Sequence, residues 1–123
     1  MVIPVSQVPA DPWRVSIVNR VSGRPVGAGV LLAGRYVLTC AHVVADALGV
    51  EPREGRPAEP VGVELLAGEQ RADAVVVPGG WTPVKDDERG DIAVLRLLGP
   101  ARVDGYAARL ALAGAHADRQ VRM

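Results

Sequence analysis

Hydrophobic and polar residues alternate near the start of the chain. Val15 and Ile17 are separated by Arg14 and Ser16, which is the two-residue period of a half-buried strand. The pattern predicts a strand over residues 13–20. Because only one face of such a strand is apolar, it needs partners that cover that face.

Two further strands are expected directly after the first. Residues 21–25 carry the Ser-Gly and Pro chemistry of a turn, and an apolar run follows at residues 28–32, so that the two segments read as a hairpin. Residues 33–35 form another short turn, in which Gly34 can take a positive φ. The run at residues 36–39 then predicts a third strand.

The middle of the chain interrupts this pattern. Residues 43–48 are rich in Ala, Val and Leu and are followed by Gly49, which predicts a short helical turn ended by a glycine cap. Residues 51–60 contain three prolines, three glutamates and two arginines. Such a segment cannot hold a regular strand ladder and is expected to be a solvated loop.

Alternation returns in the second half of the chain. It predicts a strand at residues 61–65, a turn at 67–69 and a strand at 72–77, which together make a second hairpin. A loop is expected at 79–90, and the apolar run at 92–98 is a sixth strand. Six short strands with no long helix between them indicate an all-β barrel or sandwich.

Composition limits the size and the partners of the protein. With 123 residues, 49% of them hydrophobic, the chain can bury one modest core, so one domain is expected. Fourteen basic and fourteen acidic residues cancel, which argues against binding to nucleic acid or to an acidic membrane. The start of the chain lacks the pattern of an export signal, and no apolar run is long enough for a membrane span. Residues 1–12 are interpreted as an N-terminal arm.

Cys40 is the only cysteine of the sequence. It can form no disulfide within the chain, and no metal cluster can be built from thiolates. The single cysteine favours a reducing compartment. Together with the absent export signal, it leads us to expect a cytoplasmic protein.

His42 and Asp91 are the candidate catalytic residues. His42 follows the strand predicted at 36–39, and Asp91 directly precedes the run at 92–98. Each residue alone has an ordinary interpretation, as a structural histidine or a turn aspartate. Together, at two strand ends, they could form a pair in which the carboxylate fixes the tautomer of the imidazole and stabilises its protonated form.

Two segments resemble the catalytic motifs of trypsin-like serine proteases. Residues 27–32 and 36–44, which end in Thr-Cys-Ala-His-Val-Val, resemble the region around that family's histidine, and residues 91–95 (Asp-Ile-Ala-Val-Leu) resemble its aspartate motif. The resemblance covers residues 13–100. It implies one six-stranded antiparallel barrel, equivalent to the first barrel of the double-barrel chymotrypsin fold.

The resemblance also implies roles for individual residues. His42 would be the general base and Asp91 its orienting partner, held by the backbone N–H groups of Ala41 and His42. Secreted members usually carry a cysteine directly after the histidine, bridged to one upstream, whereas this sequence has Val43 there. The absence of this disulfide bridge agrees with a cytoplasmic protein, as in bacterial intracellular relatives. Nothing before Trp13 resembles the segment that activates secreted zymogens on cleavage.

The family's nucleophilic serine is missing from the sequence. No Gly-Asp-Ser-Gly-Gly-like motif occurs, and Ser6, Ser16 and Ser22 all precede the histidine. The oxyanion hole and specificity pocket, which belong to the second barrel, are missing with it. Residues 101–123 are then interpreted as a linker and the first strand, near 120–123, of a missing second barrel. We expect a serine endopeptidase represented by its N-terminal half and inactive alone.

Three hypotheses remain open for such a chain: a truncated protease, a half-enzyme completed by a second polypeptide, and a non-catalytic binding module derived from a protease. The expected partner is a polypeptide substrate, once a second barrel completes the site. Nucleic acid and membranes are not expected as partners. Self-association through the exposed inter-barrel face is expected, because that face should carry apolar surface.

Other chemistry finds less support in the sequence. No cofactor and no metal are expected, because His116 is the only other histidine and is interpreted as a solvated residue. The acidic residues at 86–88 are interpreted as a solvated loop tip, since adjacent acids do not point inward together. Cys40 lies near His42, but two residues at such a strand end are not expected to align for proton transfer.

Overall fold

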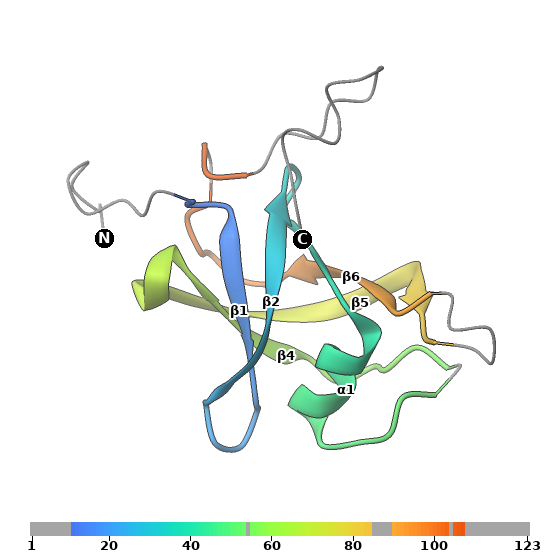
Figure 1. Cartoon of the computed structure of the whole chain (residues 1–123). Coiled ribbons are helices and arrows are strands. Elements are labelled where there is room, and N and C mark those ends of the chain that lie inside the picture. Colours follow the sequence, from blue (N-terminus) through green and yellow to red (C-terminus); the bar gives the residue numbers. More distant parts are fainter. Residues whose placement is uncertain (1–10, 54, 85–89, 104, 108–123) are drawn as a thin grey trace.

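The computed structural model of the chain describes residues 11–53, 55–84, 90–103 and 105–107. Within these ranges six strands and one α-helix are present (Figure 1). They are β1 (Arg14–Val18), β2 (Pro25–Leu32), β3 (Tyr36–Thr39), α1 (Ala41–Leu48), β4 (Val61–Leu65), a short 3₁₀ helix η2 (Leu66–Gly68), β5 (Gln70–Thr82) and β6 (Ile92–Leu97).

The strands form a closed barrel in the order β1-β2-β3-β6-β5-β4. Every neighbouring pair is antiparallel, and β4 returns to pair with β1. Closure leaves no unpaired sheet edge that could recruit another strand. The predicted six-stranded antiparallel barrel is therefore confirmed.

The core of the barrel is aliphatic, since the sequence has no phenylalanine. Alternate residues of each strand point inward, and Ile17 of β1 lies opposite Val63 of β4 with both side chains fully buried. Such interdigitated β-branched side chains suit the pleated inner surface of a small barrel. The largest fully buried aliphatic side chains are Val15, Ile17, Leu31, Val37, Val44, Val61, Val63, Leu65, Val76 and Leu95.

Helix α1 packs on one end of the barrel, where it contacts β1, β2, β4 and β6 (Figure 1). It buries Val44 and Ala47 against these strands. Gly49 follows it with a left-handed φ of 71°, and its N–H donates to the carbonyl of Asp46 at 3.1 Å. The predicted glycine cap is confirmed, although the helix begins two residues earlier than expected.

Two strand boundaries differ from the prediction by three residues or more, and the others by at most two. β2 already begins at Pro25, which the sequence pattern assigns to the turn. β5 runs to Thr82, so the loop expected at 79–90 starts inside this strand. The pairing of β5 with β6 shifts register between Val76 and Trp81, and such an irregularity tolerates proline and glycine within a strand. The strand therefore continues through residues that normally end one.

Residues after β6 pack against the barrel. The Arg35 guanidinium donates to the carbonyl oxygens of Gly99 and Ala101, at 2.5 and 2.7 Å. Gln70 exchanges two 2.7 Å hydrogen bonds with the backbone of Arg102. Val103 is only 7% exposed, so at least residues 99–103 are part of the barrel unit rather than a free linker.

Some expectations fall outside the described residues. They concern most of the N-terminal arm, the acidic loop tip at 86–88, His116 and the strand expected near 120–123. Within the described ranges, no helix has the length and apolar character needed to cross a membrane.

Gly90 occupies a conformation that other residues rarely adopt. Its φ is 102°, and a Cβ at this position would lie 2.7 Å from the carbonyl oxygen of Pro83. Gly49 also has a positive φ, but a Cβ there would meet no atom within 4 Å. Substituting each glycine by alanine therefore distinguishes the free-energy cost of the backbone conformation, which both positions share, from that of a steric clash, which only Gly90 has.

We expect Gly90→Ala to lower the free energy of unfolding by about 3 kcal/mol and Gly49→Ala by about 1 kcal/mol. Both substitutions force alanine into a left-handed conformation, but only the first also meets backbone atoms. Urea unfolding followed by circular dichroism measures both values. Equal losses in the two variants would show that the turn before β6 is not tightly packed.

Candidate active site

The residue His42 sits in the first turn of α1. β3 ends at Thr39, Cys40 is extended with φ −97° and ψ 146°, and α1 begins at Ala41. The expectation that His42 lies at a strand end is therefore wrong, because His42 belongs to the helix that follows the strand. The sequence hides this helix start, because the capping position holds cysteine instead of Ser, Thr, Asp or Asn.

The pairing of β3 with β6 determines which residue faces His42. Thr39, the last residue of β3, pairs with Ala93 of β6, and the Thr39 hydroxyl donates to the Ala28 carbonyl oxygen at 2.8 Å, which fixes the strand end to β2. The chain leaves β3 toward His42 and enters β6 from Asp91. Residues distant in sequence are thereby brought to the same end of the barrel.

Asp91 is held in an unusual backbone conformation. Its φ is 67°, directly after Gly90 with its own positive φ. Aspartate is one of the few side chains that tolerate the left-handed region. This turn lies immediately before β6 and carries the carboxylate toward α1.

Both oxygens of the Asp91 carboxylate contact His42. Oδ2 lies 2.5 Å from Nδ1 of the imidazole, and Oδ1 accepts the His42 backbone N–H at 2.9 Å. The Cys40 side chain makes no capping hydrogen bond, so the carboxylate serves as the cap of α1, where the helix dipole favours negative charge. Of the two backbone donors expected, that of Ala41 makes no such bond among the described residues.

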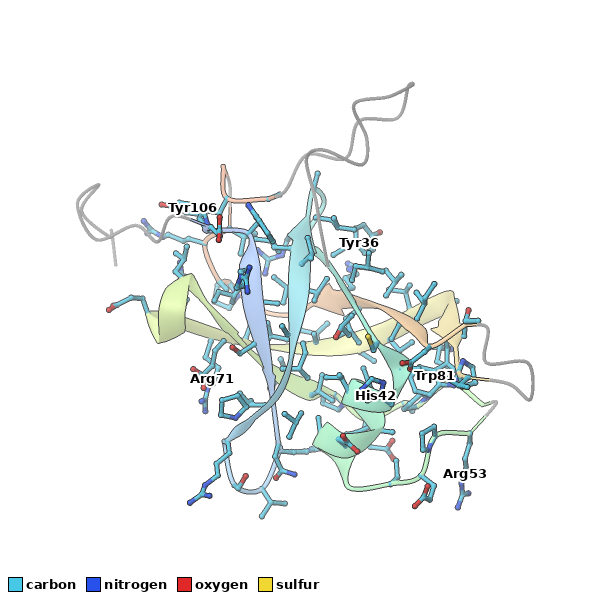
Figure 2. All side chains as sticks on the ribbon, viewed as in Figure 1. Tyr36, His42, Arg53, Arg71, Trp81 and Tyr106 are labelled. Carbon is cyan, nitrogen blue, oxygen red and sulfur yellow. The ribbon has the colours of Figure 1, made fainter. Side chains whose placement is uncertain are left out.

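The arrangement prepares the imidazole to accept a proton. With Nδ1 donating to the carboxylate, the lone pair of the neutral ring is on Nε2. The His42 side chain is 55% exposed, whereas that of Asp91 is 23% exposed. His42 projects from α1 on the surface of the barrel (Figure 2). The pair thus combines an accessible base with a more protected orienting group.

An apolar hollow of about 340 Å³ adjoins His42. Its walls come from the start of β1, from β2 and from the first turn of α1. The lining residues are Trp13, Arg14, Ala28, Gly29, Val30, Cys40, His42 and Val43. A concave apolar surface beside a candidate base is a suitable place for a ligand or another protein segment.

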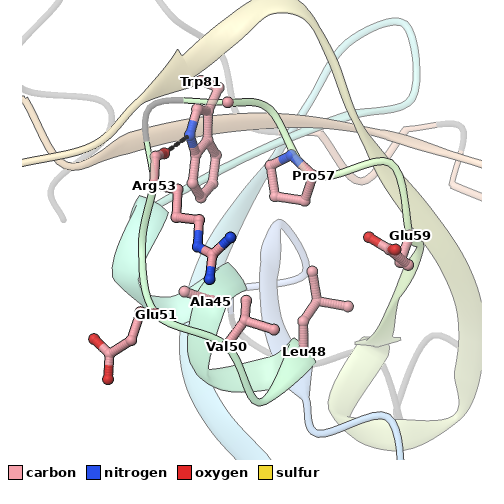
Figure 3. A pocket seen from close by; sticks show the side chains of 9 residues that line it. Ala45, Leu48, Val50, Glu51, Arg53, Pro57, Glu59 and Trp81 are labelled. Atoms are coloured by element: carbon pink, nitrogen blue, oxygen red, sulfur yellow. Dashed lines mark hydrogen bonds between the residues drawn. The ribbon is translucent and has the colours of Figure 1, made fainter.

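A second hollow of about 220 Å³ shares none of these lining residues (Figure 3). It lies between α1, the loop that follows it and Trp81 of β5. The indole N–H of Trp81 donates to the Arg53 carbonyl oxygen at 2.6 Å. This bond fixes the backbone at Arg53 onto the barrel.

Cys40 lies beside the His42–Asp91 pair. Burial, and secondly the negative charge of Asp91, raise the pKa of the Cys40 thiol. The group is therefore a neutral thiol at neutral pH, not a thiolate nucleophile. Its Sγ, a ring nitrogen of His42 and a carboxylate oxygen of Asp91 all lie within 4.8 Å of one another. The sequence analysis missed this cluster because it considered Cys40 for a disulfide, for a cluster of thiolates and as a nucleophile, but not together with an imidazole and a carboxylate.

Comparisons with known proteins identify relatives of the chain. The family model described as trypsin-like peptidase domain matches residues 27–121. A calcium-dependent serine proteinase of Mesocricetus auratus is 27% identical over an alignment of 139 positions, and the match covers 94% of this chain and 19% of that protein.

Solved structures of serine peptidases share the fold. Kallikrein-related peptidase 10 in complex with Zn²⁺ is 28% identical, with a TM-score of 0.54, and the match covers 86% of this chain and 46% of that one. Neuropsin, a serine protease expressed in the limbic system of mouse brain, is 20% identical, with a TM-score of 0.51 and coverages of 86% and 45%. The chain thus spans about half the length of these solved relatives. The barrel, its sequence motifs and the family model together show that this chain belongs to the trypsin-like peptidase domain family.

Proposed function

We propose that the chain supplies the general base and the orienting carboxylate of a serine-type endopeptidase. His42 would be the base and Asp91 its partner. The observation that carries the proposal is the double contact of Asp91, which binds both the ring and the backbone of His42. Such a contact fixes the ring against rotation and sets its tautomer.

The chemistry follows from that tautomer. Nε2 of His42 takes the proton of a serine hydroxyl as the oxygen attacks the peptide carbonyl, and later gives it to the leaving amine. Asp91 stabilises the imidazolium formed in between, without itself taking up the proton. A hydroxyl nucleophile is too weak to react at a useful rate unless such a base assists it.

In this proposal the serine comes from a second half of the fold. Among the described residues, Ser16 lies within β1 opposite Ala28, and Ser22 lies in the β1–β2 turn, where its hydroxyl accepts the Arg24 N–H. Neither is hydrogen-bonded to His42. The match to about half of each solved relative supports a missing second half, and the apolar hollow beside His42 is the surface on which it would pack.

The chain alone is then expected to lack peptidase activity. The members of a triad act as a unit, and a base without nucleophile and oxyanion donors has little acyl transfer to catalyse. The exposed hollow would also favour self-association of the isolated chain. A non-catalytic binding role is the remaining alternative, and the labelling experiment below distinguishes it.

We also infer that the chain works in a reducing compartment, the cytoplasm. Cys40 is a free thiol. A Cβ placed on Gly27 would lie 2.6 Å from both methyl groups of Val43 and 3.2 Å from its Cβ. Positions 27 and 43 therefore face each other as bridged residues do, but the valine methyls fill the space. Packing replaces a covalent link, as proteins in reducing compartments require.

The complete product of the reading frame that encodes this chain should react with a serine-directed fluorophosphonate. His42→Ala should slow this labelling by at least about 10³-fold, because the serine loses its base. Val21→Ala serves as the control, since Val21 is 96% exposed. Gel fluorescence of time courses measures the rates. Undiminished labelling of a folded His42→Ala variant would contradict the proposal, and a complete product without reactive serine that still binds peptide would favour the binding role.

The double substitution Gly27→Cys with Val43→Cys, made in a Cys40→Ala background, should form a disulfide on air oxidation. The Cβ atoms need to separate by only a few tenths of an ångström to reach the usual 3.5–4.5 Å or so. Oxidation should raise the free energy of unfolding by up to about 3 kcal/mol relative to the reduced protein. Thiol titration and urea unfolding check both effects. Free thiols that persist after oxidation would show that the two positions do not face each other.

A further inference from the structure

The proposed reaction uses His42 and Asp91 and leaves Cys40 without a role. The three side chains bring a thiol, an imidazole and a carboxylate within 4.8 Å of one another. We propose that Cys40, His42 and Asp91 form a binding site for a thiophilic divalent metal ion such as Zn²⁺, and that the bound ion switches off His42 as a base. The inhibitory part rests on the function proposed above, whereas the binding part does not.

The donor set matches this class of ion. Zn²⁺ takes Cys sulfur at about 2.3 Å and His nitrogen or carboxylate oxygen at about 2.0–2.2 Å, in tetrahedral geometry with a fourth position open to water. Donors around such an ion are about 3.3–3.8 Å apart. To bind an ion, the His42 Nδ1 and Asp91 Oδ2 atoms, now 2.5 Å apart, have to separate. Donor atoms that are up to 4.8 Å apart have to approach one another. The half-exposed His42 side chain can supply this shift by rotation.

The same donors exclude the hard cations. Ca²⁺ and Mg²⁺ require six or more oxygen ligands or several retained waters around carboxylates. One carboxylate, one imidazole and one sulfur instead favour Zn²⁺, Cd²⁺ or Co²⁺. The apolar hollow beside the cluster is lined by both Cys40 and His42, so it gives an ion a path to the two ligands that lie on its wall.

Binding changes the protons of the site in a defined way. The Cys40 thiol releases one proton to solvent and binds as thiolate. The ion takes the place of the proton on Nδ1 of His42, and that proton moves to Nε2. Each bound ion therefore releases one proton in total. An imidazole protonated on Nε2 and ligated through Nδ1 has no lone pair for a serine hydroxyl, and general-base catalysis stops.

The binding part is tested on the 123-residue chain itself. Titration with Cd²⁺ should produce a thiolate-to-cadmium charge-transfer band in the ultraviolet that saturates at one ion per chain. His42→Ala should weaken binding by at least about 10-fold, whereas His116→Ala, which removes the other histidine, should leave the titration unchanged. Circular dichroism of each variant reports whether it is folded.

The outcomes of this titration separate the proposal from simple thiol binding. A band that saturates equally well in folded His42→Ala would show that Cys40 binds Cd²⁺ alone, and would overturn the site. So would the absence of a band in the unsubstituted chain. Asp91→Asn offers a second variant, because it keeps the size of the side chain while weakening its donor oxygen. It should also reduce affinity, and unchanged affinity of the folded variant would overturn the three-residue site.

The inhibitory part is tested on the complete product. Zn²⁺ should slow its fluorophosphonate labelling, and Cys40→Ala should require at least about 10-fold more Zn²⁺ for the same fractional slowing. Equal sensitivity of the two proteins would overturn inhibition through this site. A product that never reacts with the fluorophosphonate would contradict the proposed function. The proposed metal site would then still be tested independently by the Cd²⁺ titration of the chain.

Discussion

The carboxylate of Asp91 is shared between the side chain and the backbone of one residue, His42. Its first oxygen closes the N-terminus of α1, which the side chain of Cys40 leaves uncapped. Its second oxygen orients the imidazole. Because the same group stabilises a helix end and sets the tautomer of the candidate base, the stability of this region and its proposed chemistry depend on one interaction.

The closed barrel is what allows that contact. The register that pairs Thr39 with Ala93 places the end of β3 beside the start of β6. Gly90 then lets the chain turn in a conformation that a Cβ would block, and Asp91 accepts a left-handed φ so that its carboxylate reaches α1. Barrel register and a strained two-residue turn together position the carboxylate, as expected where backbone strain is concentrated at a functional site.

The strands could be predicted from the sequence because period-two alternation directly reflects a buried and an exposed face. The candidate pair, too, could be predicted, because both residues lie next to apolar runs and within motifs that resemble those of a family. The errors lie where local signals are misleading. Pro25 and the glycines of β5 look like strand breakers, but pairing and an irregular register carry the strands through them. The helix start at Cys40 has no polar cap of its own, since its cap comes from Asp91, far away in sequence.

The proximity of Cys40 to Asp91 could not be predicted from local signals, because the two residues are far apart in the sequence. Cys40 is close to His42 along the chain, but only the pairing of β3 with β6 brings Asp91 close to both residues. The result is a cluster with three different donor atoms, of which the proposed function uses two. In the two proposals made above, that arrangement links the base to a ligand set for a soft metal ion.

The proposed function depends most on the orientation of the His42 ring. Nitrogen NMR of the chain labelled with ¹⁵N-histidine, with His116→Ala used to assign the signals, reports which ring nitrogen carries the proton. Neutral His42 should be protonated on Nδ1, with a proton that exchanges slowly with water and resonates far downfield, and Asp91→Asn should remove this signal. A ring protonated mainly on Nε2, or identical spectra with and without the Asp91 carboxylate, would contradict the proposed orientation.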